Sequence, residues 1–186
     1  MSRFAVFGTV LEDLKIIERQ RIGDDRGYLS RLFCAQELAH AGWSRPVAQI
    51  NHTFTRKLGT VRGMHFQRPP FAEAKLVTCI GGEVWDVAVD LRAGSPTFLQ
   101  WHAERLSADN GRALLIPEGF AHGYQTLSDD AVLLYCHSVP YAPQAEGGLN
   151  PQDPRLGIGW PLPISELSAR DAAHPPLTER FEGLNL

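Results

Sequence analysis

The chain has 186 residues, of which 44% are hydrophobic and 21% are charged, and its formal net charge is -3. These values are ordinary for a globular protein, and a chain of this length buries enough surface to fold as one domain without a disulfide or a metal. The slight negative charge gives no electrostatic basis for binding nucleic acid or an anionic membrane, so we expect neither partner.

Targeting and redox signals point to the cell interior. No apolar run approaches the length of a membrane span, and residues 1–4 lack the apolar segment of a secretion signal. The cysteines Cys34, Cys79 and Cys136 are odd in number and far apart, which favours a reducing compartment and core packing over disulfides. Cys136 and His137 are neighbours on one predicted strand, so they point to opposite faces and cannot act as a nucleophile pair. We expect a cytoplasmic protein.

Short segments divided by turn residues fill the first 140 positions. The N-terminal part has β-branched runs at 14–22, 28–33 and 47–54, a turn at 23–27, and a short helical segment at 34–41. Further strand segments follow at 59–67, 76–80, 83–91, 98–106, 112–116, 120–126 and 131–139. Many short strands about ten residues apart indicate an all-β sandwich or barrel.

The chain changes character after residue 140. Prolines at 140, 143, 151, 154, 161, 163, 175 and 176 leave little room for strands. Apolar residues such as Trp160 and Leu162 argue against disorder. We predict one domain over 1–186, with a core at about 14–140 and an irregular C-terminal wrap at 141–186 that has a short helix around 164–173.

Residues 59–91 hold most of the candidate chemistry. Arg62, His65, Gln67 and Lys75 lie at the ends of segments that otherwise supply core residues, so they either face water or line a cavity. Among the histidines, His65 and His122 have polar neighbours that mark a site. The sequence around four others, His40, His102, His137 and His174, marks none.

His122 ends the pattern P-x-G-x-x-H at 117–122, which resembles the second motif of the cupin superfamily, a small double-sheet β-barrel. Metal-binding cupins add an H-x-H motif and a later Glu, but here the first motif is His65-Phe66-Gln67. A metal would have His65, His122 and either Gln67 or Glu73, whereas catalytic metal centres usually have three good protein ligands. We therefore expect no metal and no cofactor.

Several further motifs follow one another in a fixed order along the chain. They are Arg62-Gly63-Met64-His65-Phe66-Gln67, Lys75-Leu76-Val77, Asp86-Val87-Ala88-Val89-Asp90-Leu91-Arg92, Ser95-Pro96-Thr97-Phe98, Ile116-Pro117-Glu118-Gly119-Phe120-Ala121-His122-Gly123, Tyr135 with Tyr141, Ile158-Gly159-Trp160-Pro161 and Ser168-Ala169-Arg170-Asp171. Together they resemble the dTDP-4-dehydrorhamnose 3,5-epimerase family over about residues 14 to 177. Because the motifs share the family's order and spacing, the resemblance is specific.

The resemblance implies a cupin double-sheet β-barrel, or jelly roll, with short peripheral helices. It implies a cofactor-independent epimerase that inverts a nucleotide-linked 4-keto-6-deoxy sugar at C3, at C5 or at both. It also implies a homodimer in which N-terminal strands add to the partner's sheet.

The reaction defines the groups that the site needs. An α-proton is roughly a dozen pK units less acidic than an imidazolium, which corresponds to ~16 kcal/mol. His65 suits the base, and the resemblance places Asp171 behind it to fix its tautomer. Lys75 is the cation for the enolate oxygen, with His122 assisting, and Tyr135 is the acid or a proton relay on the opposite face of the sugar ring.

A nucleotide diphosphate needs cations and hydrogen-bond donors. Arg62 and Arg26 suit phosphate because a guanidinium fork matches its geometry. Gln49 and Asn51 share one face of a predicted strand and can reach phosphate or base. The resemblance adds Glu146 and Arg170 near the nucleotide and Tyr141 as a contact to the sugar or a phosphate. It also places Arg26 and its neighbours, among them Arg31, in the partner's site.

The chain departs from the family near the nucleotide. The family pattern R-G-x-F-x-E is here Arg26-Gly27-Tyr28-Leu29-Ser30-Arg31, so Leu29 replaces an aromatic residue and Arg31 replaces an acid. We therefore expect a retained catalytic centre that acts on a different nucleotide sugar. Two alternatives stay open: a metal-dependent cupin isomerase or oxygenase, and a non-catalytic cupin that binds a sugar nucleotide.

Overall fold

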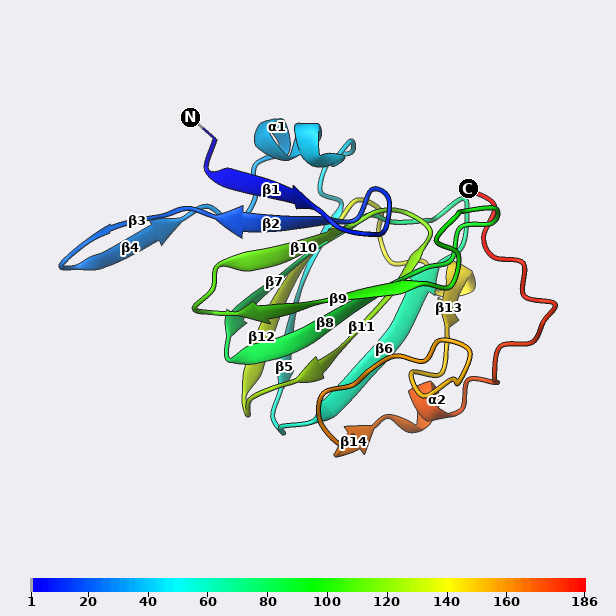
Figure 1. The fold of residues 1–186 in the computed structure, drawn as a ribbon. Coiled ribbons are helices and arrows are strands. Elements are labelled where there is room, and N and C mark those ends of the chain that lie inside the picture. The colour runs from blue at the N-terminus through cyan, green and yellow to red at the C-terminus, as the bar shows by residue number, and fades with distance from the viewer. Residues whose placement is uncertain (1) are drawn as a thin grey trace.

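Two antiparallel sheets face each other in the computed structural model of the chain, which describes residues 2–186 (Figure 1). The first sheet has the strand order β1-β2-β10-β7-β12-β5 and the second has β13-β6-β11-β8-β9, with β14 beside β6. From β5 to β13 the chain crosses from one sheet to the other at each step except the β8–β9 hairpin, as in a jelly roll, so the predicted all-β cupin fold is confirmed. The first sheet contains β1 (Phe4–Gly8), β2 (Lys15–Arg19), β5 (Gln49–Thr55), β7 (Lys75–Gly81), β10 (Arg112–Ile116) and β12 (Ala131–His137). The second contains β6 (Thr60–Gln67), β8 (Glu83–Asp90), β9 (Trp101–Ser107), β11 (Phe120–Thr126), β13 (Glu146–Gly148) and β14 (Glu166–Leu167).

The remaining elements are short and peripheral, as expected. A hairpin of β3 (Arg21–Asp24) and β4 (Gly27–Ser30) projects away from the two sheets (Figure 1). The helical segments are α1 (Ala35–Leu38), η1 (Ala39–Ala41), η2 (Pro143–Ala145) and α2 (Ala169–Ala172). Within residues 2–186, no helix has the length and apolar character needed to cross a membrane.

The main core lies between the sheets. Apolar residues alternate along each strand, so one face of each sheet turns inward, and Val77, Leu114 and Leu133 of the first sheet meet Val84 and Phe120 of the second. Each buried aliphatic side chain of this kind contributes roughly 1.5–3 kcal/mol. Cys79 packs in this core, as predicted, and all three cysteines are free.

Two further apolar clusters cover the outer faces of the sheets. On the first sheet, Leu38 and Trp43 from the α1 region pack with Cys136 of β12. On the second sheet, Leu149 and Leu156 of the C-terminal wrap belong to the cluster that also contains β6 and β8 residues. Because Cys136 lies in the outer cluster while its neighbour His137 lines a cavity between the sheets, the two point to opposite faces, as predicted.

Several predicted boundaries are wrong. The strand expected at 14–22 is two strands, β2 and β3, separated by Gln20, and the strand expected at 98–106 begins only at Trp101. The core begins with β1, ahead of the expected start at residue 14. The helix expected around 164–173 is the single turn α2.

The C-terminal wrap forms two strands where the prolines predicted little room for any. β13 pairs antiparallel with the Gln67 end of β6, and β14 pairs parallel with the Thr60 end. Both strands have only two or three residues, so they fit between the prolines and still satisfy backbone groups of β6. This pairing brings α2 beside the middle of β6.

Candidate active site

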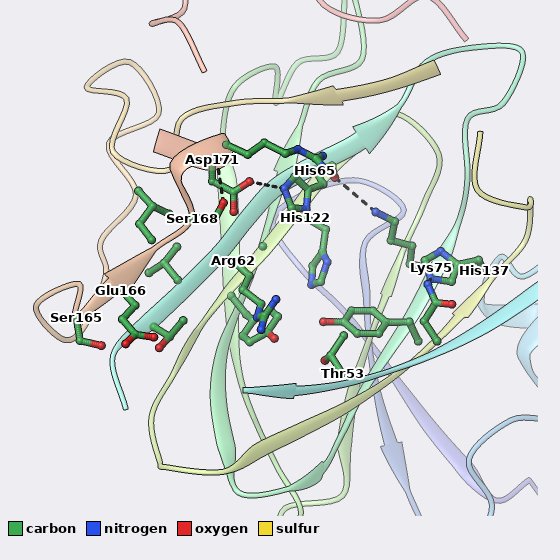
Figure 2. Close-up of a pocket in the computed structure, with 18 residues that line it drawn as sticks. Thr53, Arg62, His65, Lys75, His122, His137, Ser165, Glu166, Ser168 and Asp171 are labelled. Atoms are coloured by element: carbon green, nitrogen blue, oxygen red, sulfur yellow. Dashed lines mark hydrogen bonds and ion pairs between the residues drawn. The ribbon is translucent and has the colours of Figure 1, made fainter. Parts of the chain in front are cut away.

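A cavity of ≈ 840 Å³ opens between the two sheets, and Figure 2 shows the residues that line it. Its walls come from β5, β7 and β12 on one side and from β6 and β11 on the other, and residues 165–171 of the wrap close one end. All four residues predicted to be catalytic, His65, Lys75, Tyr135 and Asp171, line this cavity.

A bulge in β6 lets Arg62 and His65 face the same cavity. These residues are three positions apart, so a regular strand would direct them to opposite faces. The pairing of β6 with β11 shifts register between His122 and Tyr124, opposite Gly63. Gly63 has a φ of +123°, and a Cβ there would lie 2.5 Å from the Cα of Gly123. The Arg-Gly pair of the sequence motif therefore reflects a backbone position that only glycine occupies without strain.

His65 is hydrogen-bonded to Asp171. Its Nε2 lies 2.7 Å from Asp171 Oδ1, and the Gly63 amide donates to Oδ2 at 3.3 Å. The Ser168 hydroxyl caps α2 by accepting from the Asp171 amide at 3.0 Å, which fixes the carboxylate's place (Figure 2). The Nδ1 atom of His65 has no hydrogen-bond partner among residues 2–186.

Burial and hydrogen bonding set the charges of this pair. Burial lowers the pKa of His65 below 6.5, and the hydrogen bond with Asp171 offsets only part of that effect. Burial raises the pKa of Asp171. The hydrogen bond from His65 and the electrostatic attraction of that imidazole outweigh burial and leave the pKa of Asp171 below its usual range. At neutral pH the pair is therefore a neutral imidazole, ready to accept a proton, beside a carboxylate.

Lys75 lies at the start of β7 with its side chain only 9% exposed. Its Nζ is 3.1 Å from Glu73 Oε1 and 3.5 Å from the carbonyl oxygen of His65. The second oxygen of Glu73 accepts a hydrogen bond from His137 Nδ1 at 2.7 Å. The cation expected for an enolate oxygen is thus buried and paired.

Tyr135 and His122 complete the inner wall. His122 Nε2 lies 2.8 Å from Asp86 Oδ1, and the rings of His122 and Tyr135 pack edge to face with centroids 5.7 Å apart. Burial raises the pKa of Asp86, with His122 opposing the shift. Burial also raises the pKa of Tyr135 well above 10, so its phenol stays protonated at neutral pH.

The residues predicted to bind the nucleotide fall into three groups. Arg62, Asn51, His122 and Arg170 line the cavity. Arg62 Nε donates to Thr55 Oγ1 at 3.0 Å, which holds the guanidinium in place. Gln49 and Glu146 contact these lining residues without lining the cavity themselves: Gln49 donates to Asn51 at 3.0 Å, and Arg170 pairs with Glu146. Tyr141 is one step further away, since its hydroxyl donates to Glu146 at 2.8 Å.

Arg26 and Arg31 lie away from this cavity. Arg26 is at the tip of the projecting hairpin and pairs with Asp24 at 2.6 Å, while Arg31 pairs with Glu37 of α1. The structure therefore does not bring either residue to the cavity of its own chain.

The described residues 2–186 contain no group of three or more His, Cys, Asp or Glu side chains that could hold a metal ion. Gln67, weighed above as a ligand, donates to the Phe71 carbonyl at 3.0 Å and accepts from the Ala142 amide at 2.6 Å. Glu73 is bound to His137 and Lys75. His65 and His122 have separate carboxylate partners.

Sequence reasoning did not predict the contacts that three of these groups, His137, Asp86 and Glu73, make around the cavity. His137 lies two residues after Tyr135, so both side chains point to the same face of β12. This two-residue spacing was visible in the sequence. Asp86 lies directly across from Tyr124 in the pairing of β8 with β11. Glu73 lies in the loop before β7, where no periodicity reports its direction.

The chain is similar to known proteins over most of its length. It is 45% identical to the dTDP-4-dehydrorhamnose 3,5-epimerase of Salmonella typhimurium, over 94% of this chain and 96% of that protein. Its structure matches dTDP-6-deoxy-D-glucose-3,5-epimerase RmlC of Legionella pneumophila in complex with dTDP-4-keto-L-rhamnose, with a TM-score of 0.87, 40% identity and coverage of 92% and 91%. It also matches ChmJ, a 3'-monoepimerase from Streptomyces bikiniensis in complex with dTDP-quinovose, with a TM-score of 0.84, 36% identity and coverage of 90% and 85%.

The family assignment comes from a match along nearly the whole chain. The sequence model of the dTDP-4-dehydrorhamnose 3,5-epimerase family matches residues 8–179, which include every strand from β2 to β14 and the α2 turn that holds Asp171. The chain therefore belongs to the dTDP-4-dehydrorhamnose 3,5-epimerase family.

Proposed function

We propose that this isomerase epimerises a nucleotide-linked 4-keto-6-deoxyhexose by enolisation next to the ketone. The observation that supports this most directly is the placement of a neutral imidazole and a protonated phenol on opposite sheets of one cavity. His65 comes from β6 and Tyr135 from β12, and Lys75 lies on β7 beside them. Inversion of a carbon needs a base and an acid on its two sides, together with a cation for the enolate oxygen.

Proton abstraction is the first step. His65 Nδ1 takes the proton from the carbon beside the ketone, and the electrons of the C–H bond move to form an enolate with its charge on the ketone oxygen. Lys75 stabilises that oxygen, with His122 assisting. Asp171 holds His65 through Nε2 and stabilises the imidazolium that results.

Proton return from the opposite side completes the inversion. Tyr135 donates its phenolic proton to the carbon, and the enolate electrons form the new C–H bond as the ketone is restored. His65 loses one proton to solvent and Tyr135 gains one, so the enzyme ends in its starting state. His65 is 36% exposed, which allows this exchange with water.

The nucleotide binds where cations and amides line the cavity mouth. Arg62 and Arg170 suit the diphosphate, because a guanidinium offers two parallel N–H donors, and Asn51 supplies a further donor. The relatives described above include enzymes bound to dTDP sugars. The substrate class that this supports is a dTDP-4-keto-6-deoxyhexose or a relative with another base.

A homodimer completes the nucleotide site in this proposal. The hairpin of β3 and β4 exposes Ile22, Tyr28 and Leu29, and β1 exposes Val6 and Phe7 on the same side of the fold (Figure 1). Exposed apolar side chains on projecting strands favour contact with a second copy. Such a contact would carry Arg26 to the partner's cavity, where it adds a cation for the diphosphate.

Deuterium exchange tests the two catalytic roles separately. With dTDP-4-keto-6-deoxyglucose in deuterium oxide, NMR of the C3 and C5 protons should show exchange at each carbon that the enzyme enolises. His65→Ala should lower exchange and inversion by about 10²–10⁴-fold because the base is gone. Tyr135→Phe should keep exchange, since His65 still removes and returns a hydrogen on one face, but lose inversion.

The control for this experiment is His40→Ala, because His40 is exposed and lies outside the cavity. Equal exchange in wild type and His65→Ala would exclude His65 as the base. An absence of exchange in a folded wild type with every nucleotide sugar tried would favour the non-catalytic alternative.

The pH dependence of kcat/KM follows from the two pKa shifts. His65 must be neutral, and its pKa lies below 6.5, so kcat/KM should fall only at acid pH, as the pH drops through that lowered value. Tyr135 must be protonated, and its pKa lies well above 10, so no alkaline loss from Tyr135 should appear up to about pH 9. An acid limb centred above 6.5 would contradict this assignment of the base.

Nucleotide preference tests the departure at Leu29 and Arg31. This chain has Arg31 where the family has an acid, and the reversed charge favours a base other than thymine. Calorimetric titration with dTDP, UDP, CDP and GDP should therefore show another diphosphate binding as tightly as dTDP. Arg31→Glu, which restores the family's acid, should shift the preference toward dTDP. Binding of dTDP at least tenfold tighter than the others would contradict this prediction.

Subunit mixing tests whether Arg26 acts across a dimer. His65→Ala and Arg26→Ala proteins should each be weak alone, because each lacks one part of the site. When they are refolded together in equal amounts, half of the dimers are mixed and each has one intact site, so roughly a quarter of wild-type activity should return. No recovery, or a monomer in sedimentation, would show that Arg26 does not complete a partner's site.

A further inference from the structure

Lys75 is held by a carboxylate that does not itself line the cavity. Glu73 lies in the loop two residues before Lys75, and its Oε1 atom is 3.1 Å from Nζ. The side chains of both residues are only 9% exposed. Apart from the His65 carbonyl at 3.5 Å, Glu73 is the only hydrogen-bond or ion-pair partner of Nζ among the described residues. The position of the ammonium group therefore depends mainly on Glu73.

His137 is the second partner of the same carboxylate. Its Nδ1 lies 2.7 Å from Glu73 Oε2, so each oxygen of Glu73 has its own partner. His137 and Lys75 are directly opposite each other in the pairing of β12 with β7. Glu73 thus bridges two side chains that the sheet already holds side by side.

The protonation states of this group follow from its contacts. Burial raises the pKa of Glu73, but Lys75 and His137 outweigh that effect and leave the value below the usual range, so Glu73 is a carboxylate. A carboxylate only accepts hydrogen bonds, so His137 donates from Nδ1. Its Nε2 then faces the Asn51 amide nitrogen, 3.4 Å away, as an acceptor. Glu73 and Lys75 thus form an ion pair, and His137 donates a hydrogen bond to the second oxygen of the Glu73 carboxylate.

We infer that Glu73 and His137 are positioning residues that prepare Lys75 for the enolate, an inference that rests on the proposed function. Glu73 keeps a charged ammonium at the cavity wall before the substrate binds. When the enolate oxygen forms, it competes with Glu73 for Lys75. The hydrogen bond from His137 then keeps the buried carboxylate partnered, which matters because an unpartnered buried charge is costly.

A purely structural role for the same contacts has a different signature. If Glu73 only joined the 68–74 loop to β12, its loss would lower stability and leave the chemical step in the folded fraction unchanged. If it positions Lys75, its loss lowers kcat and leaves KM nearly unchanged, because the enolate exists only after the substrate is bound. The effect should also require Lys75.

Glu73→Gln tests the first residue, since it keeps the shape of the side chain and removes the charge. We expect kcat for C–H exchange to fall by about 10–100-fold, which is below the full loss of an oxyanion donor, with KM within about threefold of wild type. Glu179→Gln, a change at an exposed position, is the control and should match wild type. In a Lys75→Met background, Glu73→Gln should lower kcat no further.

His137 offers a second test that does not remove the ion pair. His137→Asn keeps a donor near the position of Nδ1, whereas His137→Leu has none. We expect His137→Leu to lower kcat by about 3–10-fold, which is less than the roughly tenfold or greater effect of a direct hydrogen bond to a charged group, because His137 acts on Lys75 only through Glu73. His137→Asn should restore most of the loss. The control is His40→Leu, which should leave kcat unchanged. Thermal melting of every variant reports whether it is folded.

Three results would overturn the inference. Glu73→Gln with wild-type kcat would do so, as would an equal loss from Glu73→Gln with and without Lys75. If Glu73→Gln does not fold, equal kcat values in His137→Asn and His137→Leu would do the same. If the wild type exchanges sugar protons normally in these cases, the proposed function is unaffected. If the wild type exchanges no sugar proton, both the proposed function and the inference about Glu73 and His137 are wrong.

Discussion

The hydrogen bond between His65 and Asp171 joins two parts of the chain that are 106 residues apart, and the candidate site depends on it. His65 lies on a central strand, while Asp171 lies in a wrap with little secondary structure of its own. The wrap reaches that place because β13 and β14 pair with the two ends of β6 and because Leu149 and Leu156 pack on the outer face of the second sheet. The contact between His65 and Asp171 therefore forms only when the last quarter of the chain is docked on β6.

Burial is the constraint that gives the site its chemistry. It lowers the pKa of His65 and raises that of Tyr135, so over a wide range of pH the proposed base is unprotonated while the proposed acid is protonated. Burial also makes every unpaired charge costly, which explains why each histidine of the cavity has a carboxylate partner. Asp171 pairs with His65, Asp86 pairs with His122, and Glu73 pairs with His137. The low pKa of the base and the network around it therefore have one cause.

The sequence predicted the all-β fold and most of the cavity because strand alternation and motif order are local signals. The four residues that the motifs grouped together, His65, Lys75, Tyr135 and Asp171, line one cavity in the structure. The sequence did not predict that Arg62 and His65 share a face, because this requires the bulge at Gly63 and a register shift against β11. It named Glu73 only as a possible metal ligand and missed its contacts with Lys75 and His137, because Glu73 lies in a loop without periodicity. It also missed the tail strands, which pair with backbone groups of β6. In each of these cases the deciding contact is with a distant strand, which a single sequence does not report.

The cavity and the hydrophobic core share one continuous surface of the first sheet. Along β12, Leu133 belongs to the core while Tyr135 and His137, two and four residues later on the same face, line the cavity. β7 mirrors this arrangement, since Val77 lies opposite Tyr135 and Lys75 lies opposite His137. Tyr135 itself belongs to both, because it packs in the core cluster and presents its phenol to the cavity. Close packing beneath a side chain limits its rotamers, so the core that stabilises the sheets also holds the phenol of Tyr135 toward the cavity, as the proposed role of an acid requires.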